Sequence, residues 1–361
     1  MRPILKTITS DGCRSYLVGC EATGACLLVD PKVGNEATYR SLMDSYGLEL
    51  QGVFDTHTHA DHLSAATRFM APGVPLYMSH ATPVQRATHA LRDGDELVVG
   101  KLTFHVIEVP GHTPDSLALF GHGLVLSGDS LFVGSLARAD FLGSDPAQLF
   151  QSVTERLMTL PEGTLVYPGH DYNDILFTTI EHEQENSDAL RHSDGAAYAE
   201  SLNATIGAGN SAAVNLNLEL NLATSPDLPE SAGNAAACCA APSSGGRIRI
   251  PELPATEATA LHSELAEKGS WIDVRDPFEF RHSHIPATQN IPLGELGFRL
   301  GDLKSEGPIY LSCRSGVRSV TAAKTLLRLG VTANPVSIAG GILAWEELGQ
   351  PVVRDSTADL R

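Results

Sequence analysis

The chain has 361 residues, 42% of them hydrophobic, which is long for one ordinary core and predicts two domains, each with its own apolar interior. Lys and Arg total 25 against 43 Asp and Glu, and the formal charge of −18 argues against a nucleic-acid or anionic-membrane partner. There is no secretory h-region and no membrane-spanning run of about 18 apolar residues, so a cytoplasmic location is expected. Six cysteines without a CxxC pair or regular spacing predict reduced thiols.

Up to about residue 190, short β-rich runs alternate with amphipathic segments, which predicts a mixed α/β domain. The segment Ser144-Asp145-Pro146 supplies a cap residue followed by proline at a first-turn position, so a helix is expected to begin there. The expected strands cover 16–18, 26–29, 52–55, 103–109, 118–119, 124–126 and 165–167.

From about 203 to 246 the composition shifts to Asn, Ala, Ser, Gly and Pro, which predicts a linker with an extended strap. Leucine alternates with polar residues from Asn215 to Leu222, and we expect these leucines to line one face of a strand lying over the first domain. Cys238 and Cys239 lie in an Ala-rich run that gives them no preset geometry for a metal or sulfur relay.

The alternation of strands and helices resumes at about residue 248. Strands are expected over 270–274, 309–312 and 336–338, and an amphipathic helix over 317–329. This spacing predicts a small parallel sheet covered by helices. The predicted organisation is therefore a first domain over 1–202, a linker over 203–247 and a second domain over 248–361.

A dense group of potential metal ligands follows the strand expected at 52–55, at what should be a strand-to-helix turn. Three imidazoles and a carboxylate fall within six residues, namely His57, His59, Asp61 and His62. Neutral histidine offers a lone pair at pH 7, and aspartate adds the negative charge that stabilises a bound cation. Few structural roles need this density, so the HxHxDH cluster predicts a metal site.

Single potential ligands follow three further strands: His112 in PGHT, Asp129 in SGDS and His170 in YPGH. Loops at strand ends, held by a rigid sheet, are the usual place for a catalytic site. In this order the motifs resemble the metallo-β-lactamase superfamily over about residues 5–190, which implies an αββα sandwich with a metal in a cleft at one edge. That scaffold hosts hydrolases, redox enzymes and nucleases, so it does not by itself define the reaction.

Three segments resemble the persulfide dioxygenase family in particular: PGHTPDS at 110–116, ARADF at 137–141 and PGHDY at 168–172. The resemblance implies one Fe(II) held by His57, His112 and Asp129, a facial triad that leaves positions open for a persulfide and O2. It further implies ligand-orienting or proton-transfer roles for His59, Asp61, His62 and His170, and a substrate pocket lined by Arg138 and Tyr172.

Two alternatives remain open at this site. Arg138, expected to pair with a carboxylate of glutathione, could instead form an ordinary salt bridge with Asp140 or Asp145. All seven ligands of a two-metal site are also present, so a dizinc thioesterase similar to glyoxalase II is the alternative enzyme. Its first zinc would be bound by His57, His59 and His112, its second by Asp61, His62 and His170, with Asp129 bridging the two.

A cysteine loop, CRSGVRS, follows the strand expected at 309–312 and precedes a helix. Cys313 would there meet inward-pointing amides, a positive helix end and two arginines, all of which stabilise a thiolate or persulfide. The loop resembles the rhodanese active site, as do segments 272–280, 284–287 and 290–292. The resemblance implies that Cys313 accepts a sulfane sulfur while Arg314 and Arg318 attract an anionic donor such as thiosulfate. A phosphatase loop has one residue more between cysteine and arginine, so sulfur transfer is preferred.

Together these features predict an enzyme that oxidises glutathione persulfide, or a similar small persulfide, with O2 to sulfite and thiol, coupled to sulfane-sulfur transfer at Cys313. The expected cofactor is one Fe(II) per chain, and the expected partners are a small-molecule persulfide, thiosulfate and O2, without nucleic acid or membrane. The sequence leaves a homodimer open. A sulfur carrier with an inactive iron domain is disfavoured because the ligands and the Cys313 loop are complete.

Overall fold

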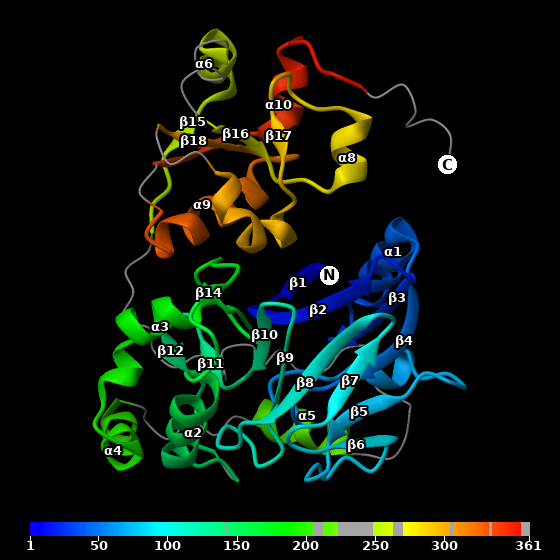
Figure 1. Cartoon of the computed structure of the whole chain (residues 1–361), viewed down its shortest axis with the longest axis vertical. Helices are drawn as coiled ribbons and strands as arrows, with labels where there is room; N and C mark the ends of the chain where they lie inside the picture. The colour runs from blue at the N-terminus through cyan, green and yellow to red at the C-terminus, as the bar shows by residue number, and fades with distance from the viewer. Residues whose placement is uncertain are drawn as a thin grey trace. The chain divides into compact units, whose positions relative to one another are not determined.

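The computed structural model describes residues 1–141, 143–205, 212–222, 248–262, 270–303, 307–331 and 334–354. It divides into two compact units, Met1–Tyr172 with Phe177–Gly245, and Gly246–Arg361 with Asn173–Leu176 (Figure 1). No helix among the described residues is long and apolar enough to cross a membrane. The linker limits at 203 and 247 remain predictions.

The first sheet of the N-terminal unit is covered on its outer face by helix α1 (Glu36–Tyr46). Tyr39 and Met43 of that helix pack against Leu17, Leu28 and Val53 in one buried apolar cluster. Its strands, in spatial order, are β1 (Ile4–Ser10), β2 (Cys13–Cys20), β3 (Ala25–Val29), β4 (Glu49–Phe54), β5 (Leu76–Ser79) and β6 (His89–Leu91). The apolar run of β3 is buried at every position, as expected for a strand covered on both faces.

The second sheet is covered by α2 (Pro146–Ser152), α3 (Ile180–Asn186) and α4 (Gly195–Thr205) (Figure 1). Asp145 caps α2 by accepting hydrogen bonds from the amides of Ala147 and Gln148, as its sequence predicts. Its strands, in spatial order, are β14 (Thr178–Thr179), β13 (Leu165–Pro168), β10 (Leu124–Gly128), β9 (Leu117–Gly121), β8 (Leu102–Glu108) and β7 (Glu96–Val99).

The two sheets pack face to face. Tyr16 on β2 meets Tyr167 on β13 edge to face, with ring centroids 5.9 Å apart, and the Tyr16 hydroxyl donates to the carbonyl of Pro168 at 2.5 Å. With helices on both outer faces, the N-terminal unit is an αββα sandwich, which confirms the predicted fold class. Every strand predicted for this domain matches a strand of these two sheets, although the predictions over 52–55 and 103–109 run one residue past the ends of β4 and β8.

The predicted strand within residues 215–222 is wrong, because Ala212–Leu222 form a helix, α5. Asn217 and Asn221 are four residues apart and therefore share one face of this helix, where both are buried. The alternation of leucine and polar residues suggested a strand, but the asparagine pair has helical spacing. Cys238 and Cys239 lie outside the described residues.

The HxHxDH motif does not lie at a strand-to-helix turn. After β4 the chain runs through an irregular loop, and only a single 3-10 turn, Ala66–Arg68, follows it. Asn221 bonds the backbone of this loop, donating to the carbonyls of His59 and His62 at 2.9 and 2.8 Å and accepting from the amide of Ser64 at 3.0 Å. Asn217 adds a bond to the carbonyl of Asp61 at 3.0 Å. These contacts provide hydrogen-bond partners for backbone N–H and C=O groups of the loop. In a helix, such groups would bond one another.

The C-terminal unit is a five-stranded sheet in which every neighbouring pair is parallel. Helices α6 (Ala255–Ala260) and α10 (Gly341–Glu347) cover one face, and α9 (Val317–Arg328) lies on the other (Figure 1). Its strands, in spatial order, are β15 (Glu252–Leu253), β19 (Pro335–Ile338), β18 (Ile309–Ser312), β16 (Ser270–Asp273) and β17 (Gln289–Asn290). The prediction of a small parallel sheet covered by helices is confirmed.

Candidate metal centre and sulfur-transfer loop

The predicted ligands of the N-terminal unit come together at one edge of the sandwich. They lie on loops that follow β4, β8, β10 and β13, and all are buried: His57, His59, Asp61, His62, His112, Asp129 and His170. The loop that carries His170 can approach Asp129 closely because Gly169 has no side chain. A Cβ at this position would collide with the Oδ1 atom of Asp129.

Hydrogen bonds place a free lone pair on the Nε2 atom of His57. The Thr56 hydroxyl donates to Asp30 Oδ2 at 2.9 Å, so it can only accept from His57 Nδ1, which lies 2.9 Å away. Nε2 is therefore the unprotonated nitrogen of a neutral ring. It is buried and has no hydrogen-bond partner among the described residues. Burial, followed by the charge of His59, holds the pKa of His57 well below its ordinary value, so the ring stays neutral.

His112 and Asp129 present their ligand atoms in the same way. His112 Nδ1 donates to the carbonyl of Arg138 at 2.7 Å, which leaves Nε2 as the lone-pair nitrogen. Asp129 accepts from His170 Nδ1 through Oδ1 at 2.9 Å, and its Oδ2 has no hydrogen-bond partner within the described part of the chain. Burial opposes ionisation of Asp129, but the charge and hydrogen bond of His170 outweigh it and keep the pKa well below its ordinary value.

These three residues form a pocket of ligand atoms that suits a divalent cation. His112 Nε2 lies 3.6 Å from Asp129 Oδ2, and the rings of His57 and His112 meet edge to face with centroids 5.0 Å apart. One ligand atom from each residue lies within 4.8 Å of the other two. Two neutral imidazoles and one carboxylate, each held by a second hydrogen bond, match the donor set of a 2-His-1-carboxylate metal site.

The other four predicted residues form a hydrogen-bonded network beside this pocket. His170 bridges two carboxylates, with Nδ1 on Asp129 Oδ1 and Nε2 3.0 Å from Asp61 Oδ2. His62 Nδ1 lies 2.8 Å from the same Asp61 oxygen. Burial acts to lower the pKa of His62, but the Asp61 carboxylate outweighs it and raises the pKa to about 10. His59 donates its Nε2 proton to Asp30 Oδ1 at 3.1 Å.

Three residues at this site were missed by sequence reasoning: Asp30, Thr56 and Cys13. Asp30 directly follows β3, has a φ of +47° and bonds both Thr56 and His59, so it holds the loop that carries the candidate ligands. Cys13 begins β2, and its thiol lies 3.3 Å from Asp61 Oδ2. Burial and the Asp61 charge act to raise the pKa of Cys13, but hydrogen bonds with His170 and His62 lower it below the ordinary value. None of the three belongs to a local motif; only the position of Asp30 at a strand end was a usable signal.

The two predicted substrate residues differ in their surroundings. The guanidinium of Arg138 forms a fork with Asp140, with two contacts of 2.7 Å, so the expected alternative of an ordinary salt bridge is present. Its backbone carbonyl, by contrast, orients His112. Tyr172 is 44% exposed and stacks on His170 with ring centroids 6.0 Å apart. Tyr172 therefore places an accessible aromatic face next to the buried network.

In the C-terminal unit, Cys313 lies between the end of β18 and the start of α9. Its thiol is buried, accepts a hydrogen bond from the amide of Gly316 at 3.1 Å, and lies 3.5 Å from the Ser319 hydroxyl. The amide of Ile342 donates to the carbonyl of Cys313 at 2.9 Å. Gly341, with a φ of +57°, permits this approach because a Cβ there would collide with the Cys313 carbonyl.

The two arginines of the loop are not equivalent. Arg318 binds both carboxylate oxygens of Glu279 at 2.6 and 2.8 Å, so its charge is neutralised within the unit. Arg314 is exposed, and no ion pair among the described residues involves it.

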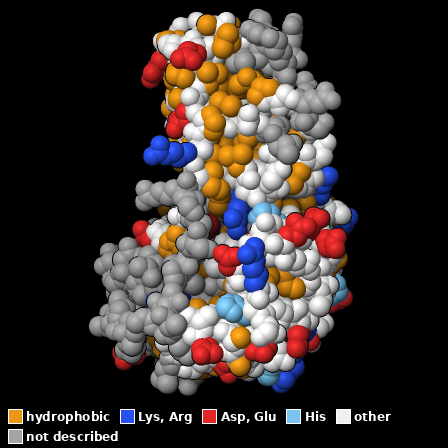
Figure 2. Space-filling view, turned by 90° about the vertical axis from the view of Figure 1, so that its left-hand side faces the viewer, with side chains coloured by type: hydrophobic (Ala, Val, Ile, Leu, Met, Phe, Trp, Pro, Cys, Tyr) orange, Lys and Arg blue, Asp and Glu red, His pale blue; other side chains and the backbone are white. Residues whose placement is uncertain are grey.

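A hollow of about 650 Å³ is lined by Arg314, Arg275, His282 and Arg354, together with apolar Phe278 and Leu343, among others. Figure 2 shows hydrophobic side chains gathered over the C-terminal unit.

Each of the two units matches the model of a known protein family. The family model described as the Metallo-beta-lactamase superfamily matches residues 8–170, and that of the Rhodanese-like domain matches residues 257–348. With the αββα fold and the buried ligand cluster, these matches define a metallo-beta-lactamase-fold protein that carries a rhodanese-like domain.

Two similar proteins indicate which family within this superfamily the chain belongs to. Persulfide dioxygenase ETHE1, mitochondrial, from Bos taurus is 32% identical over 174 residues, which cover 47% of this chain and 68% of the relative. The crystal structure of ETHE1 from Myxococcus xanthus, 34% identical, superposes with a TM-score of 0.52 over 54% of this chain and 88% of its own. The chain therefore belongs to the persulfide dioxygenase family of the metallo-beta-lactamase superfamily.

Relatives of a second kind match the same region. Hydroxyacylglutathione hydrolase from Aeromonas hydrophila is 37% identical over 151 residues, which cover 41% of this chain and 57% of the relative. Similarity of the N-terminal unit is thus shared between an oxidative and a hydrolytic branch of one superfamily. The two branches share one fold, so the substrate and the metal depend on the residues of the site.

Proposed function

We propose that the N-terminal unit oxidises a low-molecular-weight persulfide, such as glutathione persulfide, with O2 and water to sulfite and the free thiol. One Fe(II) would be held by His57, His112 and Asp129. The observation that carries this proposal is the orientation of their three ligand atoms: each is buried, directed into one pocket, and held by a hydrogen bond at the far side of its residue. Bound iron would supply the redox chemistry with O2, which zinc does not have.

The chain's own residues would orient the ligands and move protons. Thr56 and the Arg138 carbonyl hold the two imidazoles in the tautomer that presents Nε2. His170, between Asp129 and Asp61, holds a proton within reach of both carboxylates. The reaction releases two protons for each persulfide oxidised, so a buried group that shares protons with a carboxylate network has a role in it.

For the thiol carrier we propose contacts with Tyr172 and Arg138. Tyr172 offers an exposed ring beside His170, which suits the apolar part of a small thiol. Arg138 already pairs with Asp140, so a carboxylate of glutathione would have to replace Asp140 at the guanidinium.

In the C-terminal unit we propose that Cys313 accepts the outer sulfur of thiosulfate, releasing sulfite, and passes it to a thiol as a persulfide. The Gly316 amide would stabilise the sulfur anion, and Arg314 would meet the anionic donor at the surface. Arg318, neutralised by Glu279, would instead brace the loop. The persulfide formed this way is the substrate proposed for the N-terminal unit.

A dizinc thioesterase similar to glyoxalase II remains the second candidate, because its seven ligand residues lie together here and hydroxyacylglutathione hydrolases are among the relatives. The test is a paired assay. Anaerobically purified, iron-loaded protein receives glutathione persulfide and is followed for O2 uptake and sulfite; zinc-loaded protein receives a glutathione thioester and is followed for hydrolysis. We expect O2 uptake with sulfite as product and no thioester hydrolysis. Hydrolysis without O2 uptake would establish the thioesterase instead.

A further inference from the structure

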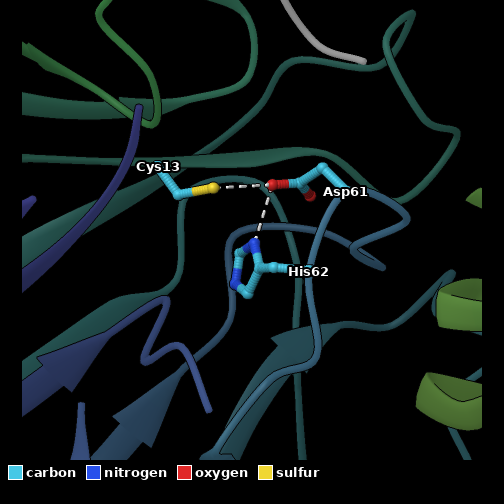
Figure 3. A group of neighbouring side chains, drawn as sticks. All are labelled: Cys13, Asp61 and His62. Carbon is cyan, nitrogen blue, oxygen red and sulfur yellow. Dashed lines mark hydrogen bonds and ion pairs between the residues drawn. The ribbon is translucent and has the colours of Figure 1, made fainter. Parts of the chain in front are cut away.

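The turn that joins β1 to β2, residues 10–13, borders the candidate metal centre. Cys13, at the end of this turn, forms an antiparallel backbone bridge with His170. Its thiol lies 3.3 Å from the Asp61 carboxylate, with which it is drawn in Figure 3. Side chains that contact the β1–β2 turn are therefore close to the buried network of the site.

Tyr172, which we propose as a contact of the thiol carrier, lies against this turn. A Cβ at Gly12 would be 2.5 Å from the Cε1 atom of the Tyr172 ring, and Gly12 has a φ of +83°. Glycine is therefore the residue that fits this position without strain. Because the Tyr172 side chain is not buried, the turn presents an accessible aromatic face.

Lys32 brings a positive charge to the same turn. Its ammonium donates to the carbonyl of Ser10 at 3.3 Å and to Asp11 Oδ2 at 2.9 Å, and it lies 3.8 Å from the sulfur of Cys13. The backbone of Lys32 is held in place, since its amide donates to the Tyr39 hydroxyl at 2.8 Å. The β1–β2 turn thus has a cation and an aromatic ring as neighbours.

The ion pair of Lys32 is easier to exchange than that of Arg138. Arg138 binds Asp140 through two contacts of 2.7 Å, and the two side chains are only 14% and 17% exposed. Lys32 makes a single contact with Asp11, whose side chain is 48% exposed. Water and salt screen an ion pair with an exposed partner, so such a pair is weak. A substrate carboxylate would therefore replace Asp11 at a lower cost than Asp140.

Given the persulfide oxidation proposed above, on which this assignment rests, we propose that Lys32 binds a carboxylate of the thiol carrier. Lys32 then makes the N-terminal unit selective for a persulfide whose carrier is acidic over one without carboxylates. The chain has a formal charge of −18, so an anionic substrate needs a cation placed locally at the site. Tyr172 would meet the apolar part of the same carrier.

The test is calorimetric titration of the iron-loaded, full-length protein with S-methylglutathione under anaerobic conditions. This probe keeps the carboxylates of glutathione but has no free thiol, so its binding requires neither O2 nor turnover. Lys32→Met keeps the apolar stem and removes the charge, and we expect it to bind the probe about tenfold more weakly than wild type. Lys32→Arg should recover most of the affinity. The control is Lys6→Met, which removes an ammonium 4.4 Å from the Tyr46 ring and should bind like wild type.

Asp11→Asn acts in the opposite direction, because it removes the carboxylate that competes for Lys32. We expect it to bind S-methylglutathione about two- to fivefold more tightly than wild type. Binding by wild type should also weaken as salt is added, and binding by Lys32→Met should respond less. If Lys32→Met fails to fold, unchanged affinity in Asp11→Asn together with salt-independent binding by wild type would still overturn the proposal.

Steady-state O2 uptake provides a separate measurement. With glutathione persulfide, Lys32→Met should raise KM about tenfold and leave kcat within about twofold of wild type, whereas KM for 2-mercaptoethanol persulfide should not change. No binding of S-methylglutathione by wild type, or equal affinity in wild type and Lys32→Met, would refute the role of Lys32 even if O2 uptake is normal. Weaker binding by Lys32→Met without any O2 uptake by wild type would refute only the proposed dioxygenase activity.

Discussion

At the scale of single residues, one hydroxyl decides how a metal ligand is protonated. Thr56 donates to Asp30 and accepts from His57, so the proton of His57 resides on Nδ1 and the lone pair on Nε2. The seven candidate ligand residues could be predicted because HxHxDH, PGH and GD are local motifs. Thr56, Asp30 and Cys13 could not, because their roles depend on contacts between strands that are distant in the sequence.

We expect Thr56→Val to weaken iron binding by about 10- to 100-fold, because the side chain keeps its shape but no longer fixes the tautomer of His57. Thr67→Val is the control, since it removes a buried hydroxyl that has no hydrogen-bond partner among the described residues. The measurement is iron retained during dialysis against a chelator. Equal retention in both variants would show that Thr56 does not orient the ligand.

The ion pair of Glu279 and Arg318 predicts a pH dependence. Burial acts to raise the pKa of Glu279, but the hydrogen bond and charge of Arg318 lower it below the ordinary 4.5. A carboxyl group whose pKa is lower in the folded than in the unfolded protein stabilises the fold at pH values above its unfolded-state pKa. This contribution is lost as the pH falls through its folded-state pKa. Glu279→Gln should therefore lower the melting temperature at pH 7, with a difference from wild type that shrinks below about pH 4.5. Glu346→Gln, which affects an exposed pair, should change little. A constant difference across this pH range would exclude the ion pair as its cause.

At the scale of elements, apolar runs predicted the strands that are buried at nearly every position, such as β2, β3 and β10. The edge strands β1 and β7 are only partly buried, and their sequences did not predict them. Helix α5 was a further exception: its leucines alternate like those of a strand, and its asparagines act through contacts that no local pattern reveals. The irregular loop of the HxHxDH motif was likewise mistaken for a strand-to-helix turn, because its backbone is satisfied by α5 and not by its own helix.

We expect Asn221→Ala to destabilise the N-terminal unit by about 1–3 kcal/mol, since it strips partners from buried carbonyls of His59 and His62. It should also lower iron retention, because those carbonyls belong to the loop that carries His57. Glu219→Ala, an exposed change on the same helix, is the matched control. Thermal unfolding with iron analysis is the measurement, and identical behaviour of the two variants would contradict a supporting role for α5.

At the scale of the whole molecule, the N-terminal unit has two six-stranded sheets and the C-terminal unit has one five-stranded sheet. Each unit also has its own buried apolar core and its own candidate site. We therefore expect Cys313→Ser to abolish thiosulfate-dependent turnover and to leave oxidation of supplied glutathione persulfide within about twofold of wild type, since the proposed oxidation uses residues of the N-terminal unit alone. Serine keeps the bond with Gly316 but cannot carry sulfane sulfur. Parallel loss of both activities would show that the units depend on each other.

The central claim is that His57, His112 and Asp129 hold the iron that oxidises a persulfide. Its most direct test is O2 uptake with glutathione persulfide, measured together with metal content on the same samples of wild type and Asp129→Ala. We predict that uptake in wild type rises in proportion to bound iron and is complete at one iron per chain, and that Asp129→Ala loses iron and uptake together. Full iron in Asp129→Ala, or wild type that binds two zinc ions and consumes no O2, would contradict the account.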